Sequence, residues 1–103
     1  MNINNLMKQA QKMQAGMARV QEELKEDRVE ASAGGGTVKV VMSGDMQVVS
    51  VTIDPAAVDP EDVELLQDMV AAATNEAVRM AQEIAAQKMQ SVTGGMNIPG
   101  LGM

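Results

Sequence analysis

Two runs of apolar residues, each spaced alternately three and four positions apart, constrain the fold of this 103-residue chain more than any other feature. Such spacing predicts an amphipathic helix that carries one apolar stripe. We therefore predict helices at residues 3–27 and 60–92, roughly 38 Å and roughly 50 Å long at 1.5 Å per residue. Their stripes are Ile3, Leu6, Ala10, Met13, Met17, Val20 and Leu24 in the first helix, and Val63, Leu66, Val70, Ala73, Ala77, Met80 and Ile84 in the second.

Between the two helices, over residues 28–53, the apolar period changes to two, which predicts β-strands. Gly34-Gly35-Gly36 and Gly44-Asp45 divide this segment into three strands, and an antiparallel meander is the simplest topology. Asp59 followed by Pro60 predicts the N-cap and the first residue of the second helix. The glycine-rich residues 93–103 are expected to be a flexible tail after one domain of residues 1–92.

The lengths of these elements predict self-association. A sheet of three short strands spans only ~20 Å, so both helices extend beyond it and their stripes stay partly uncovered. The predicted fold class is α+β: a long N-terminal helix, a three-stranded antiparallel sheet and a long C-terminal helix, in an intertwined homodimer with protruding helices. The residues expected at the dimer interface are Met13, Met17, Val20, Leu66, Val70 and Met80.

The chain contains no His, Cys, Trp, Tyr or Phe, and this limits its function. Without imidazole or thiolate it lacks the usual general base, nucleophile and soft metal ligand. We therefore predict a binding protein with no catalytic residue, cofactor, metal site or small-molecule substrate. The acidic residues 59–68 are interpreted as a helix start and not as a metal site. No apolar run approaches the ~20 residues that span a bilayer, so no membrane partner is expected and the cytoplasm is the expected location.

Charge is distributed unevenly along the chain. The formal net charge is −6, yet residues 1–20 contain Lys8, Lys12 and Arg19 and no acid, whereas residues 54–68 contain six acids and no base. The three bases lie away from the apolar stripe, at heptad positions f and c. They are either phosphate contacts or an ordinary solvated helix face, and the residues alone leave both readings open. Arg79 and Lys88 are further candidates for phosphate contact on the second helix.

Four segments together resemble the YbaB/EbfC family of bacterial nucleoid-associated proteins: residues 29–40, Ile53-Asp54-Pro55, residues 71–77 and residues 93–100. This resemblance implies a tweezers-shaped homodimer that binds double-stranded DNA with little sequence preference and affects nucleoid organisation and gene expression. The lack of aromatic rings favours duplex over single strands, because base stacking is unavailable. The alternative is a non-enzymatic protein–protein adaptor that uses the same amphipathic helices.

Overall fold

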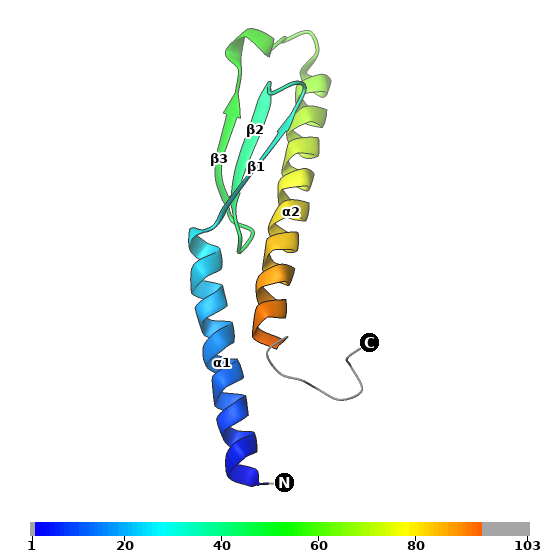
Figure 1. Cartoon of the computed structure of the whole chain (residues 1–103). Coiled ribbons are helices and arrows are strands. Elements are labelled where there is room, and N and C mark those ends of the chain that lie inside the picture. The colour runs from blue at the N-terminus through cyan, green and yellow to red at the C-terminus, as the bar shows by residue number, and fades with distance from the viewer. Residues whose placement is uncertain (1, 94–103) are drawn as a thin grey trace.

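The structure, a computed structural model, describes residues 2–93 and shows the predicted α+β architecture (Figure 1). Helix α1 (Ile3–Glu26) is followed by the strands β1 (Arg28–Ala33), β2 (Val38–Ser43) and β3 (Val48–Ile53). A short 3-10 helix η1 (Pro55–Ala57) precedes helix α2 (Val63–Thr93). The order of helix, three strands and helix is confirmed. The predicted tail falls outside the described residues except for Thr93, which is the last residue of α2.

The sheet is the predicted antiparallel meander, in the order β1-β2-β3. Val40 of the central strand pairs with Ala31 of β1 and with Val51 of β3, so these three residues lie on the same face. A bulge shifts the register between Val41 and Met42. In the turn between β1 and β2, Gly34, Gly35 and Gly36 all have positive φ, which explains the use of glycine there.

The core lies between the sheet and α2 and is built from small aliphatic side chains. Helix α2 packs on β1 and β2, where Ala73, Ala77 and Ala81 are completely buried. Alanine lets the helix axis approach the sheet closely, so a core forms although no aromatic side chain is present. The residues they cover on the strands are Val29, Ala31, Val38, Val40 and Met42.

The predicted start of the second helix is wrong by three residues. Helix α2 begins at Val63, and the Leu65 backbone N–H donates to Asp62 Oδ1 at 3.2 Å, so Asp62 is the N-cap. The Asp59 carboxylate instead accepts from the Glu61 N–H at 2.9 Å, and the Asp62 N–H donates to the Asp59 carbonyl at 3.0 Å. Two Asp residues three positions apart offer the same capping chemistry, and the tight turn at Asp59 decides which of them is used.

Helix α1 lies at one end of the sheet and runs antiparallel to the last turns of α2, and its N-terminal half projects beyond them (Figure 1). Val20 and Leu24, near the end of α1, are buried. The result is an elongated molecule with dimensions of 69 × 27 × 16 Å. In this shape the N-terminal half of α1, which carries Lys8 and Lys12, lies at one end, and η1 with the acidic residues around it lies at the other (Figure 1).

Candidate nucleic-acid interface

Three basic side chains form a line along α1, which we call the basic line: Lys8, Lys12 and Arg19. Asn2 is the N-cap of the helix, since its Oδ1 accepts from the Asn4 N–H at 3.0 Å, and the helix is unbroken from Ile3 to Glu26. Because 3.6 residues make one turn, spacings of four and seven place the three bases within roughly 40° of each other around the helix. All three are exposed. The basic line lies roughly 150° from the centre of the apolar stripe of α1.

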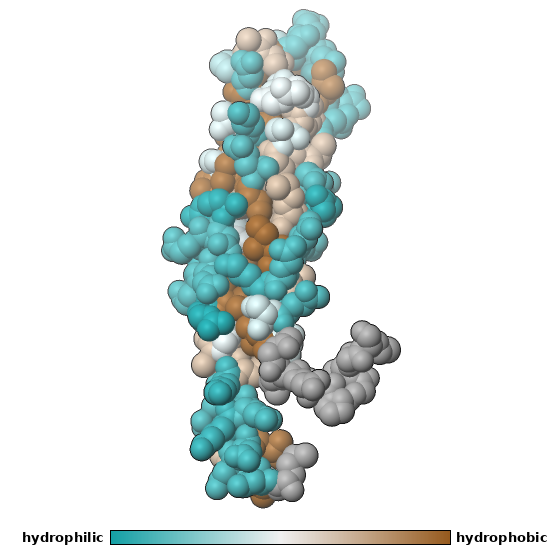
Figure 2. Space-filling model, viewed as in Figure 1, coloured by the Kyte–Doolittle hydropathy of each residue, from teal (hydrophilic) through white to brown (hydrophobic). Residues whose placement is uncertain are grey.

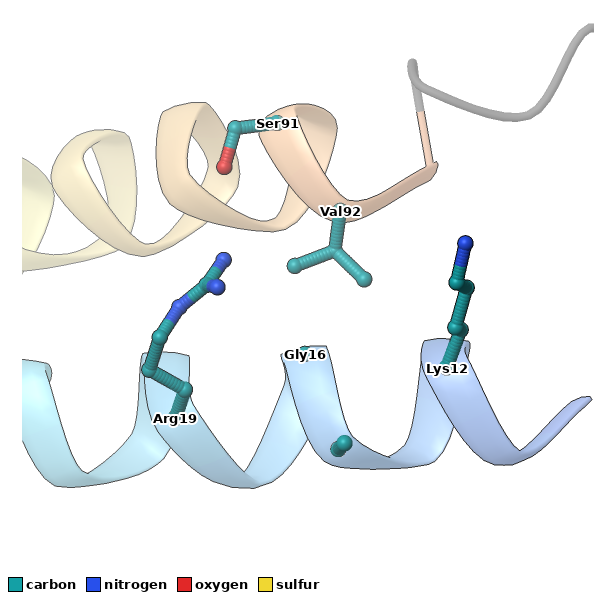
Figure 3. A pocket seen from close by; sticks show the side chains of 6 residues that line it. Lys12, Gly16, Arg19, Ser91 and Val92 are labelled. Atoms are coloured by element: carbon teal, nitrogen blue, oxygen red, sulfur yellow. The ribbon is translucent and has the colours of Figure 1, made fainter. Parts of the chain in front are cut away.

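The end of α2 docks beside the basic line. Val92 packs against Gly16, where an added Cβ would lie 3.0 Å from Val92 Cγ1, so a larger residue there would require the Val92 side chain to shift. Lys12 and Arg19 flank the contact and extend toward α2 (Figure 3). Together they border an open depression of about 500 Å³, lined also by Ala15 and Ser91. The sequence places Lys12 and Arg19 away from the apolar stripe, and only the fold brings them next to α2.

The basic line is weakly neutralised by neighbouring acids. Arg19 Nε lies 3.6 Å from Glu23 Oε1, an exposed i,i+4 pair of the kind that contributes little to stability. Within residues 2–93, neither Lys8 nor Lys12 has a carboxylate oxygen within 4.0 Å. The basic line therefore presents its charge to solvent, where a phosphate could meet it.

Arg79 and Lys88, the two bases of α2, are held by acids. Arg79 is 2.6 Å from Glu76 and 3.1 Å from Glu83, and its hydrogen bond to Glu76 is the main reason that its pKa is raised. Lys88 Nζ is 2.8 Å from Asp27 Oδ2 and 3.2 Å from Glu23 Oε2, and the Asp27 carboxylate is the main cause of its raised pKa. Lys88 thus joins α2 to the junction of α1 and β1.

The residues predicted at a dimer interface differ in how much surface they expose. Met17 is exposed and Met13 half-buried, whereas Val20 is only 1% exposed and is already covered by its own chain. Leu66, Val70 and Met80 are half-buried and pack against the core between α2 and the sheet.

Sequence reasoning missed an uncovered apolar surface on β3. Val48, Val49 and Val51 are each about half exposed, although Val51 lies on the same sheet face as the fully buried Val40. Helix α2 covers β1 and β2 and leaves this third strand open. Alternating valines are typical of a half-buried strand, but only the position of α2 shows which strand stays uncovered.

Two further kinds of site were tested in the described part of the chain. Residues 2–93 contain no group of three or more acidic side chains placed to hold a metal ion. Neither helix in that range combines the length and the apolar character that a bilayer-spanning helix needs.

Comparison with known proteins gives concordant results. Residues 1–96 match the model of the YbaB/EbfC DNA-binding family. A "nucleoid-associated protein" of Alkaliphilus metalliredigens is 58% identical, over 97% of this chain and 88% of the relative. Another, from Acetivibrio thermocellus, is 59% identical over 97% of this chain and 89% of the relative. The crystal structure of the uncharacterized protein HP0035 from Helicobacter pylori shares the fold, with a TM-score of 0.77 at 23% identity, over 93% of this chain and 99% of that one.

Proposed function

The chain belongs to the YbaB/EbfC DNA-binding family, and from this premise we propose that it binds duplex DNA of the nucleoid through phosphate contacts made by Lys8, Lys12 and Arg19. The single observation that carries the proposal is the basic line, in which three exposed bases share one face of a projecting helix. Lysine and arginine that neutralise phosphates release counterions, and this release supplies most of the affinity of non-specific DNA binding.

Little sequence preference follows from the same chemistry. Phosphate contacts position a protein on the duplex but carry no base information. No aromatic wedge is available to open a base step, because the chain contains no Phe, Trp or Tyr. Any preference would then come from the shape and deformability of the duplex, and a bend in the bound DNA would be the route to effects on nucleoid organisation and gene expression.

Arg79 and Lys88 contribute less to this proposal than the basic line does. Each already has two carboxylate partners within ion-pair distance. A phosphate would have to displace those carboxylates before it could bind, so DNA contact by these two residues stays a prediction with a smaller expected effect.

We also propose that the protein acts as a homodimer, with the uncovered valines of β3 at the centre of the interface. Val48, Val49 and Val51 form an exposed apolar strip on β3, and exposed apolar patches mark interaction surfaces. Exposed Met17 and half-buried Met13 on α1 would extend it, as would half-buried Leu66, Val70 and Met80 on α2, whereas Val20 has no free surface to contribute. A dimer doubles the basic line to six charges.

The DNA-binding proposal is tested by gel shifts on two duplexes of unrelated sequence. The variant is Lys8→Glu/Lys12→Glu, and the matched control is Lys25→Glu/Lys39→Glu, which changes the net charge equally but lies off the basic line. We expect similar affinity of the wild type for both duplexes, a large loss in the variant and a small loss in the control. Equal losses in variant and control would refute the residue assignment, and no wild-type binding at low salt would refute the function.

The dimer is tested by light scattering of the free protein. Val51→Lys places a charge in the apolar strip, and Ser50→Lys places the same charge on the neighbouring residue, which faces the other side of the sheet and pairs with Val41. We expect a dimer for the wild type and Ser50→Lys and a monomer for Val51→Lys at micromolar concentration. A wild-type monomer would contradict the proposal.

A further inference from the structure

Helix α1 is anchored near its C-terminal end. Residues 2–12 are all exposed, and the two buried side chains of the helix, Val20 and Leu24, lie in its second half. Figure 2 shows the projecting half of α1 as a narrow extension of the body that is mainly hydrophilic on the face in view. Lys8 and Lys12 lie on this extension, so the contacts at the C-terminal end of α1 determine where their charges lie.

The junction between α1 and the sheet is the single residue Asp27. It is the C-cap of α1, its N–H donates to the Glu23 carbonyl at 3.0 Å, and β1 begins at the next residue, Arg28. The Asp27 carbonyl accepts from the Gly44 N–H at 3.2 Å. Because the helix and the strand are joined by one residue, the geometry at Asp27 fixes the direction in which α1 leaves the sheet.

Lys88 of α2 holds the acidic side chains at this junction. Its Nζ lies 2.8 Å from Asp27 Oδ2 and 3.2 Å from Glu23 Oε2. Asp27 Oδ2 is closed off from water and receives no well-aligned hydrogen bond, so the Lys88 ammonium is what balances its charge. Removing one member of a shielded ion pair leaves an uncompensated charge that must find water. Without Lys88, the Asp27 carboxylate gains water only if α1 moves away from α2.

The length of α1 magnifies any movement at this junction. Lys8 lies about 28 Å along the helix from Asp27, at 1.5 Å per residue. A tilt of about 10° would therefore move Lys8 by about 5 Å. Successive phosphates of one DNA strand are about 3.4 Å apart along the duplex axis. A small tilt is thus enough to take the basic line out of register with the phosphates of a duplex.

We propose that Lys88 is a positioning residue for DNA binding: by holding Asp27 and Glu23, it fixes the direction in which α1 presents the basic line. The inference rests on the proposed function, and it differs from a direct phosphate contact by Lys88. Glu23 Oε1 also lies 3.6 Å from Arg19 Nε, which connects these ion pairs to the basic line. The variant Asp27→Asn separates the two roles. It would free a phosphate-binding Lys88 and strengthen DNA binding, whereas it weakens binding if Lys88 positions α1.

The first test measures the direction of α1 in the free protein by pulsed electron paramagnetic resonance. Spin labels are placed at Gln11→Cys on α1 and Ser32→Cys on β1, both exposed positions in a chain without native cysteine. Dilution with unlabelled protein restricts the signal to distances within one chain. Relative to the labelled chain with Lys88 intact, we expect a shift of about 5 Å, or a distribution at least about twofold broader, in Lys88→Met and no change in Lys88→Arg.

Lys25→Met is the matched control for the distance measurement. It removes the same charge from an ion pair with Glu22 that lies entirely within α1, at 3.1 Å. The label distances in Lys25→Met should therefore equal those in the labelled chain with Lys88 intact. Unchanged distances in Lys88→Met would overturn the proposal.

The second test measures DNA affinity by gel shift, at a temperature where circular dichroism shows every variant to be folded. We expect at least about tenfold weaker binding in Lys88→Met and at least about threefold weaker binding in Asp27→Asn, although the latter removes a negative charge. Lys88→Arg should bind like the wild type, and Lys25→Met should lose less than about threefold. Tighter binding by Asp27→Asn would identify Lys88 as a phosphate contact and overturn the proposal. Absence of wild-type binding would refute the proposed function, and the label distances would still decide whether Lys88 sets the direction of α1.

Discussion

Replacement of Gly44 by alanine should displace α1 from the sheet and lower stability strongly. Gly44 is buried directly after β2, and its N–H donates to the Asp27 carbonyl at 3.2 Å. An added Cβ would lie 2.8 Å from Leu24 Cδ2, 2.9 Å from the Leu24 carbonyl oxygen and 3.2 Å from Leu24 Cα. Two of these three atoms belong to the backbone and cannot rotate away, so the last turn of α1 has to move.

The size of this effect follows from the cost of overpacking. Extra methyl groups forced into a packed site cost about 1–3 kcal/mol. For a domain of this size, 1 kcal/mol corresponds to about 4–8 °C in Tm, so a cost of about 2 kcal/mol lowers Tm by about 8–16 °C. We expect a loss of this size in thermal unfolding followed by circular dichroism, at one fixed protein concentration because association would make Tm concentration-dependent.

Gly16→Ala is the matched control for Gly44→Ala. Its Cβ would meet only the side chain of Val92, at 3.0 Å from Cγ1, and a side chain can adjust. Alanine in place of glycine also favours a helix interior by about 1 kcal/mol. We expect Gly16→Ala to melt at or above the wild-type Tm. If Gly44→Ala unfolds at the wild-type temperature, the close approach of Leu24 to Gly44 is wrong, and so is the placement of α1.

Three further outcomes are expected. If the two basic lines of a dimer together neutralise six phosphates, the logarithm of the observed DNA-binding constant should fall with the logarithm of the salt concentration at a slope of about −5.4. Lys8→Glu/Lys12→Glu leaves two such contacts per dimer and should reduce the slope to about −1.8. An unchanged slope would exclude these contacts. Because Asp62 caps α2, Asp62→Ala should lower the free energy of unfolding in urea by about 1 kcal/mol, which is more than Asp59→Ala should. A larger loss of stability in Asp59→Ala than in Asp62→Ala would show that Asp59 is the cap. The acids around Lys88 raise its pKa above 10.5, so its stabilising effect is complete below pH 10.5 and is lost as pH rises through the raised folded pKa. The Tm difference between wild type and Lys88→Met should therefore be constant near neutral pH and shrink as the pH rises above 10.5. A Tm difference that does not change with pH would contradict the pairing of Lys88 with Asp27 and Glu23.

The local chemistry of the chain was enough to predict its elements. Alternating apolar residues define strands, and three-four spacing defines helices, because each pattern reflects the geometry of a few neighbouring residues. The predicted meander is confirmed for the same reason, since short glycine turns leave adjacent strands few other ways to pair. The start of α2 was misplaced because Asp59 and Asp62 carry the same signal within one turn.

The candidate site could be predicted in part. The basic line needs only a helix, so the spacing of Lys8, Lys12 and Arg19 was sufficient to place them on one face. The ion pairs of Lys88 could not be predicted, because Glu23 and Asp27 lie more than sixty residues away and meet it only through the packing of α2.

The sequence by itself determined the two amphipathic helices, the three strands between them and the basic face of α1, because these depend on interactions within a few residues. Only the tertiary structure decided that α2 meets α1 at Gly16 beside the basic line, that β3 stays uncovered, and that Lys88 is paired. An apolar period specifies which face of an element is to be buried, but not which partner buries it. That choice is made by the packing of the whole chain, where alanines on α2 set its approach to β1 and β2 and leave the third strand open.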